Sequence, residues 1–324
     1  MARGPSQEGR PSGPPRAQLT MSPGSADAAE LLWLEALLGD RVVAVVEVTP
    51  PWETRTGTQV VTLGRGDRVV VQRMSDRRAL GRRLRLGRLL PTIAPWVPVP
   101  EVLAGDAAAP APFVVTRFIP GVSGRELLAD DAGAELLGRR MGELARDLAR
   151  VPTRAVRLSD LWGDPDRLAT AAHRWLDGAP TELGPPARQV LDRLLDRLPD
   201  ELGGHAPVFA HGDFAPVNVI LRDGEAVALL DLERARLAHP LFDAAWWRWI
   251  LRHHHPERWA AAGPAFLFAA GLDDGPRTAA RLDLMAALQC LEMLHRSPAH
   301  PAATRRAWRA RLLSVLAWAG DRGT

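Results

Sequence analysis

The stretch HGDFAPVN, residues 211–218, followed by Asp231, decides how this chain is interpreted. Short apolar runs flank the stretch, and Asp223-Gly224 is a strong local signal for the turn of a β-hairpin. A hairpin with this turn returns Asp231 to the end where Asn218 lies. Carboxylate and amide oxygens are ligands of Mg²⁺, together with water and phosphate oxygens. The stretch therefore predicts a magnesium and phosphate site in which Asp213 accepts a proton from a substrate hydroxyl.

A simpler explanation is open for each acidic residue taken alone. An aspartate at the end of a strand often caps a turn or a following helix and takes no part in chemistry. An acid and an amide on one loop, with a second acid after the hairpin, favour the functional interpretation over that explanation.

Two motifs together resemble those of a known family. HGDFAPVN at 211–218 and LLDLERARLAHPLFD at 229–243 are similar to the Brenner-type motif pair of the aminoglycoside phosphotransferase and choline kinase-like family, small-molecule kinases with the protein-kinase-like fold. The resemblance implies an α+β, two-lobed fold. Residues 27–120 are expected to form a small antiparallel-sheet N-lobe that binds nucleotide, and residues 121–324 a mainly helical C-lobe that carries catalysis and substrate binding. Residues 1–26, rich in Pro, Gly, Ser and Arg, are expected to be a disordered tail.

The resemblance assigns a role to each polar residue of the motif pair. Asp213 matches the catalytic base, and His211 matches a residue that supports the catalytic loop. Asn218 and Asp231 match the ligands of Mg²⁺, and Asp243 is expected to anchor the loop without reacting. Ala238 and His239 depart from the pattern, because the family often has Gly-Asp there. The role of Glu233, at the metal site or in support of the loop, stays open.

The resemblance also places ATP, the expected co-substrate, in the N-lobe. Arg73 closes a predicted strand, and a guanidinium there can bind two phosphate oxygens at once, although a solvated strand end would look the same. The other nucleotide contacts implied lie in the turn-rich loop at 49–57 and in the backbone of the hinge that holds adenine: Thr54, Arg55, Thr56, Thr116 and Phe118.

The helix predicted after this strand departs from the family. Members generally carry a Glu that pairs with the basic residue of the strand, but residues 76–88 contain none. Arg83 occupies the expected place. Two explanations follow: Asp76 substitutes for the Glu, or phosphate alone holds Arg73.

Composition narrows the class of protein. Hydrophobic residues make up 46% of 324 residues, enough for a sizeable core. Cys290 is the single cysteine, which excludes an internal disulfide and suggests the reducing cytoplasm. The N-terminal segment lacks the apolar core of a secretory signal, and no apolar run is long enough to span a membrane. The net charge is only +3, so the basic pI reflects arginine and predicts no nucleic-acid partner.

The expected activity is transfer of the γ-phosphoryl group of ATP to a hydroxyl of a small molecule. Residues 121–324 carry 27 Asp and Glu against 26 Arg, a balance that argues against a highly cationic acceptor. A less charged antibiotic is one candidate, and a metabolite such as a sugar or an amino alcohol is another.

A non-catalytic nucleotide-binding regulator stays open as an alternative to an enzyme. A protein kinase is disfavoured, because the segment between Asp231 and Asp243 is too short for a long activation loop. The sequence fixes neither the oligomeric state nor the choice between ATP and GTP.

The tryptophans at 246, 247 and 249 suggest a stacking surface for a ligand, but three aromatic residues within four positions cannot all lie on one side of a helix. At least one of them is expected in the core.

Overall fold

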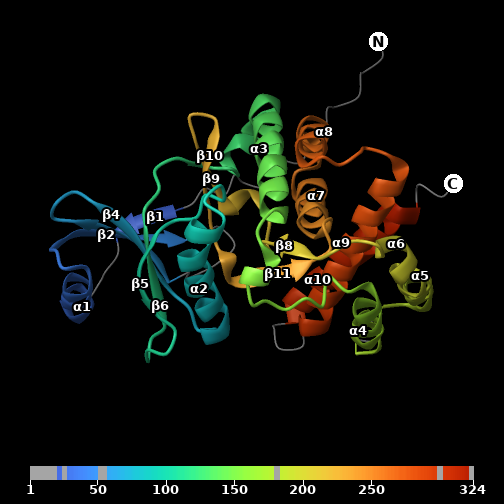
Figure 1. The fold of residues 1–324 in the computed structure, drawn as a ribbon, viewed down its shortest axis with the longest axis horizontal. Coiled ribbons are helices and arrows are strands. Elements are labelled where there is room, and N and C mark those ends of the chain that lie inside the picture. The colour runs from blue at the N-terminus through green and yellow to red at the C-terminus, as the bar shows by residue number, and fades with distance from the viewer. Residues whose placement is uncertain (1–19, 24–27, 50–56, 179–182, 298–301, 321–324) are drawn as a thin grey trace, which may run out of the picture.

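The structure, a computed structural model, describes residues 20–23, 28–49, 57–178, 183–297 and 302–320. Its N-terminal part is an antiparallel sheet in the strand order β1-β2-β3-β4-β6-β5 (Figure 1). The strands are β1 Thr20–Pro23, β2 Val42–Thr49, β3 Thr58–Leu63, β4 Arg68–Arg73, β5 Val102–Asp106 and β6 Phe113–Arg117. Strand β1 lies within the expected disordered tail, so that expectation is wrong for these four residues. The expected ATP contacts Thr54, Arg55 and Thr56 lie outside the described residues.

The two faces of this sheet are covered by different helices. Val69 and Val71 of β4 are buried in one apolar cluster with Leu34 of helix α1, Ala28–Leu38. On the other face, Val114 of β6 is buried against Leu80 and Leu84 of helix α2, Arg77–Ile93. Because side chains alternate along a strand, each residue of β4 is assigned to one helix or the other.

Helix α2 lies between the sheet and the helical lobe (Figure 1). Its Leu86 and Leu90 are fully buried in the core of the helical lobe, while Leu80 faces the sheet. Asp76 is the N-cap and accepts hydrogen bonds from the N–H groups of Arg78 and Ala79. Asp76 is thus engaged with the backbone of its own helix, and Arg73 forms its ion pair with Glu30.

The C-terminal part contains two small sheets, and the motif pair lies in and between their strands. β9, Val219–Arg222, pairs with β10, Glu225–Leu229, and with β7, Val122–Ser123. β8, Val208–Ala210, pairs with β11, Arg236–Ala238. In the turn between β9 and β10, Asp223 and Gly224 both have positive φ, 52° and 77°, as a type I′ turn requires. The hairpin that the sequence predicts is therefore present.

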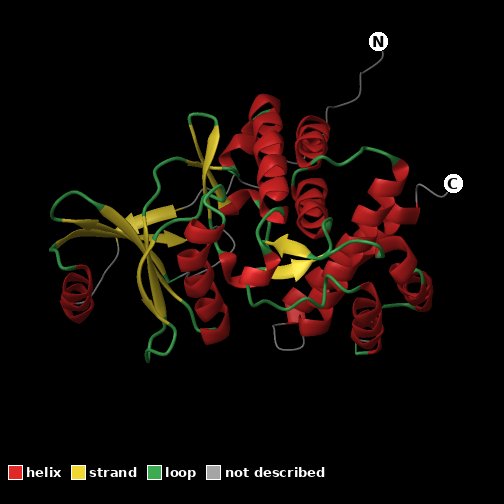
Figure 2. Ribbon diagram, viewed as in Figure 1, coloured by secondary structure: helices red, strands yellow, loops and turns green. Residues whose placement is uncertain are grey.

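Helices form the rest of the molecule (Figure 2). They are α3 Asp131–Ala149, α4 Pro165–Asp177, α5 Pro185–Asp196, α6 Leu198–Leu202, α7 Phe242–His254, α8 Trp259–Ala270, α9 Pro276–Arg296 and α10 Ala302–Gly320. Gly138 and Gly142 let α3 approach α8 closely, because a Cβ at either position would collide with the backbone of α8. In the described part of the chain, no helix combines the length and the apolar character that crossing a membrane needs. The predicted α+β, two-lobed fold is confirmed.

Candidate active site

The loop of residues 211–218 leaves β8 and ends in a short 3₁₀ turn, η3, Pro216–Asn218. Gly212 has φ 86°, in the left-handed region that glycine adopts at no steric cost. A Cβ on Gly212 would also collide with the carbonyl oxygen of Arg234. Glycine is therefore required at this position for two independent reasons.

Asp243, at the start of α7, anchors the loop as predicted. One carboxylate oxygen accepts from the N–H of His211 at 2.7 Å, and the other from the N–H of Gly212 at 3.0 Å. Burial raises the pKa of Asp243, and the hydrogen bonds from the two N–H groups oppose that shift.

His239 explains the departure from the family's Gly-Asp. Its ring Nδ1 accepts a hydrogen bond from the N–H of Leu241 at 3.1 Å, the contact that an aspartate side chain makes in such a turn. Burial lowers the pKa of His239 to about 4, with further lowering by the charges of His205 and Arg281. A neutral imidazole thus acts as the acceptor before α7.

His211 forms hydrogen bonds with both halves of the site. Its Nδ1 accepts from the N–H of Asp213 at 3.2 Å, so Nε2 carries the proton and donates to the carbonyl oxygen of Leu230 at 2.6 Å. Asp213 thereby lies at a fixed place relative to Leu230, the residue directly before Asp231. The imidazole is fully buried.

Asp213, the expected base, has further support from two side chains. The amide of Asn218 donates to the carbonyl oxygen of Asp213 at 2.8 Å. The indole Nε1–H of Trp246 donates to Oδ1 of Asp213 at 3.0 Å. The role of Trp246 was not predicted. Its spacing of three residues from Asp243 on one helix was a usable signal, because such residues share a face.

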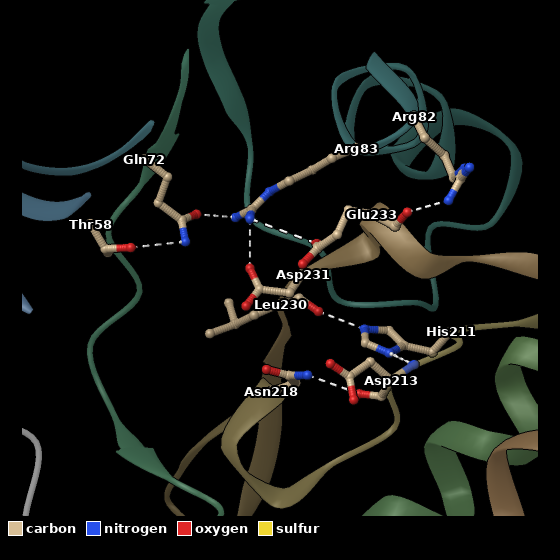
Figure 3. Close-up of polar contacts among 10 residues, drawn as sticks. All are labelled: Thr58, Gln72, Arg82, Arg83, His211, Asp213, Asn218, Leu230, Asp231 and Glu233. Carbon is tan, nitrogen blue, oxygen red and sulfur yellow. Dashed lines mark hydrogen bonds and ion pairs between the residues drawn. The ribbon is translucent and has the colours of Figure 1, made fainter. Parts of the chain in front are cut away.

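Asn218 and Asp231 come together across the hairpin, where a metal ion was expected. The N–H of Leu230 donates to the backbone oxygen of Asn218 at 2.8 Å, and the amide oxygen of Asn218 points away from Asp213 (Figure 3). Asp231 adopts a left-handed conformation with φ 59°, which is uncommon for a non-glycine residue and occurs preferentially at Asp and Asn.

The residues around Asp231 fit Mg²⁺. Oε2 of Glu233 is buried without a hydrogen-bond partner beside Asp231. Burial raises the pKa of Glu233, and the charge of Asp231 raises it further. An added cation would relieve both effects. Across the described ranges, no three or more His, Cys, Asp or Glu residues group around a possible metal position.

Arg73, the expected phosphate contact, lies away from Asp213 and Asp231. It follows Val69 and Val71 on the α1 face of the sheet. There it forms an ion pair with Glu30 at 2.9 Å, and its guanidinium lies 4.6 Å from the centre of the Trp33 ring.

The two expected hinge residues take part in the sheet itself. Thr116 is buried between its partners Val70 and Val102. The N–H of Phe118 donates to the carbonyl oxygen of Arg68 at 3.2 Å, and the Arg68 guanidinium covers the Phe118 ring at 3.8 Å. The amide of Phe118 is thus already used within the lobe.

Two arginines of α2 reach the site instead. Arg83 donates to Oδ1 of Asp231 at 2.6 Å, and it also donates to the side-chain oxygen of Gln72 (Figure 3). Arg82 donates to the backbone oxygen of Glu233. Sequence reasoning placed Arg83 where the family has glutamate.

Solved structures with the same fold were found by comparison. Macrolide 2′-phosphotransferase MphH from Brachybacterium faecium, as apoenzyme, is 20% identical, with 88% of this chain and 97% of that chain covered and a TM-score of 0.64. A thermostable mutant of aminoglycoside phosphotransferase APH(4)-Ia, in ternary complex with ADP and hygromycin B, is 16% identical, with 89% and 98% covered and a TM-score of 0.69.

Aminoglycoside 2′-phosphotransferase-IIIa, as a GDP complex, is also 16% identical, with 88% and 96% covered and a TM-score of 0.69. At these identities the likeness concerns the fold alone. No curated protein matches the sequence. The model of the phosphotransferase enzyme family matches residues 48–282, well over half of the chain and including the whole motif pair. The chain therefore belongs to the phosphotransferase enzyme family.

Proposed function

We propose that this phosphotransferase moves the γ-phosphoryl group of ATP to a hydroxyl of a small molecule, with Asp213 as the base. The observation that carries the proposal is the placement of Asp213, Asn218 and Asp231 on one loop and hairpin. His211 ties the two parts together through Asp213 and Leu230. Phosphoryl transfer depends mainly on such positioning and on charge neutralisation.

In this mechanism Asp213 orients the acceptor hydroxyl and takes its proton as the oxygen attacks phosphorus. The hydrogen bond from Trp246 fixes one carboxylate oxygen, which leaves the other for the hydroxyl. Asn218 and Asp231 would hold Mg²⁺, which supplies charge neutralisation on the phosphate oxygens. Glu233 lies beside Asp231 as a further acidic group.

The surroundings of Trp246 support a weakly charged antibiotic as acceptor. The half-buried Trp246 ring lies 4.8 Å from Trp249 and 6.2 Å from Trp308, centre to centre, and the Arg311 guanidinium covers Trp308 at 4.4 Å. Trp249 and Trp308 are buried, so the half-buried Trp246 is the ring of this group that an acceptor could reach. An aromatic ring with a cation nearby suits an acceptor with an apolar face better than a polycation. We therefore favour a macrolide-like acceptor over an aminoglycoside, and antibiotic resistance as the biological role.

The aromatic group also answers the question raised by the three neighbouring tryptophans. Trp247 is fully buried and stacks on Phe266 at 4.1 Å, and Trp249 is nearly buried. Trp246 alone of these three contacts Asp213.

A cytoplasmic location fits this activity, because ATP is available there. Burial raises the pKa of Cys290 to about 12, so its thiol stays protonated and suits a reducing compartment.

An ADP-release screen tests the proposal. The protein is incubated with Mg²⁺ and ATP against macrolides, aminoglycosides, nucleosides, sugars and amino alcohols, and GTP is run in parallel because solved relatives carry ADP or GDP. Asp213→Asn is compared with Asp223→Asn, an exposed aspartate in the turn of the neighbouring hairpin, whose left-handed conformation asparagine also adopts.

We expect turnover with a hydroxylated compound, loss of that turnover in Asp213→Asn and full retention in Asp223→Asn. Nucleotide binding without turnover of any compound would favour the non-catalytic regulator. Absence of nucleotide binding would refute the kinase proposal.

A further inference from the structure

The strand that enters the site from the N-lobe presents an amide to α2, not a cation. Gln72 lies on the α2 face of the sheet, opposite Val114, whereas Arg73 lies on the α1 face. The facing residue of α2 is Arg83. The family resemblance implies a basic residue on the strand and a carboxylate on the helix. This chain instead has an amide on the strand and a cation on the helix.

Arg83 is held firmly in this place. Its side chain is 10% exposed and lies between Asp231 and Gln72, with Glu233 at 3.9 Å. Gln72 in turn donates to the hydroxyl of Thr58 at 3.2 Å, so polar contacts run from the start of β3 to Asp231 (Figure 3).

We propose that Arg83 is the phosphate-binding arginine of the N-lobe and that Gln72 orients it. This inference rests on the proposed function, because it concerns how the same site binds its nucleotide.

The charges around Arg83 support this role. A glutamate partner would neutralise a guanidinium, whereas the amide of Gln72 accepts a hydrogen bond and leaves the positive charge in place. Asp231 and Glu233 are the acidic groups next to Arg83. A divalent cation on Asp231 would compensate these carboxylates, so Arg83 would then be attracted to phosphate oxygens in place of Asp231.

The geometry of the guanidinium allows the same exchange. Arginine has N–H donors in a planar fork that matches phosphate as well as carboxylate. One terminal nitrogen of Arg83 donates to Asp231 and the other to Gln72. Gln72 can therefore hold the guanidinium in place while the contact with Asp231 is replaced by a contact with phosphate.

Nucleotide binding measured by calorimetry tests the proposal. The full chain and Arg83→Gln are titrated with ATP in the presence of Mg²⁺ and, separately, with adenosine, which has no phosphate. Arg88→Gln is the matched control, because Arg88 lies exposed on the same helix. Urea unfolding of each variant without ligand shows whether it is folded.

We expect Arg83→Gln to weaken ATP binding by roughly 10- to 100-fold, the effect of losing a hydrogen bond between charged groups, and to leave adenosine binding within about twofold. Arg88→Gln should bind both ligands as the native chain does. Unchanged or tighter ATP binding by Arg83→Gln would overturn the proposal, because Arg83 would then only occupy Asp231.

A second variant exchanges the two partners. Arg83→Glu alone should bind ATP more weakly than Arg83→Gln, because it adds a carboxylate beside Asp231. Combining it with Gln72→Lys, which restores a strand cation and a helix carboxylate, should recover most of the lost affinity. A double variant no better than Arg83→Glu would contradict the exchange.

These outcomes separate the inference from the proposed function. If the native chain binds ATP and turns over an acceptor while Arg83→Gln binds ATP equally well, the function stands and the role of Arg83 is wrong. If the native chain binds no nucleotide, both are wrong.

Discussion

Replacing Asp243 by alanine should loosen the catalytic loop and destabilise the whole lobe. Asp243 is 6% exposed and accepts two backbone hydrogen bonds, from His211 at 2.7 Å and Gly212 at 3.0 Å. Alanine leaves both N–H groups buried without an acceptor. Each unpaired group costs about 1–3 kcal/mol, so the gross loss is roughly 2–6 kcal/mol.

Part of this loss is offset, because the variant also removes a carboxylate whose pKa burial raises. We therefore expect the free energy of unfolding to fall by about 2–4 kcal/mol, the lower part of that range. At about 2 °C per kcal/mol for a chain of this size, Tm should fall by about 4–8 °C. Because Asp213 follows Gly212 directly, a shift of about 1 Å in the loop should also reduce kcat by roughly 100-fold.

Urea unfolding followed by tryptophan fluorescence measures the free energy of unfolding, and ADP release measures kcat. Asp243→Asn should fall between the native chain and Asp243→Ala, because its amide oxygen can still accept one of the two N–H groups. Asp192→Ala, at an exposed position on α5, is the control and should stay within about 0.5 kcal/mol of the native chain. An Asp243→Ala variant as stable as this control would refute the reasoning.

Three other substitutions test single contacts of the site. Gly212→Ala should lower Tm and reduce kcat at least about tenfold, because its Cβ collides with the backbone of Arg234 and the loop must move. The free energy of unfolding of the native chain should fall by about 3 kcal/mol as the pH falls from 6.5 to about 4, because His239 is neutral when folded and becomes protonated on unfolding. His239→Asn keeps a hydrogen-bond acceptor, so urea titrations at several pH values should show a weaker pH dependence for this variant. Trp246→Phe removes the N–H donor to Asp213 and should lower kcat roughly tenfold while leaving the KM for ATP nearly unchanged, and an unaltered kcat would contradict the assigned contact.

The catalytic loop and hairpin could be predicted from the sequence because their geometry is local. The turn at Asp223-Gly224 starts the pairing of β9 with β10, and after a register shift between Ala226 and Ala228 this pairing brings Asp231 next to Asn218. The anchoring role of Asp243 followed from the family resemblance and is confirmed by its two hydrogen bonds.

The N-lobe half of the site could not be read in the same way. A strand residue faces one side or the other according to its parity, and residues 69–71 are all valine, so no alternation marks the face. Arg73, which the sequence suggested because it is basic, lies one residue beyond Gln72 and on the opposite face, toward α1. The contact between Arg83 and Asp231 joins residues 148 positions apart and depends on how α2 packs between the lobes.

The catalytic loop and the N-lobe part of the site differ in how precisely their side chains must be positioned. Proton transfer to Asp213 requires a heavy-atom distance of about 3 Å, which is why His211, Asn218 and Trp246 all fix that residue. Attraction between a cation and phosphate falls only with the inverse of distance and depends little on direction. A cation can therefore reach the phosphates from α2 as well as from β4, and Gln72 holds Arg83 in place without adding a further carboxylate beside it.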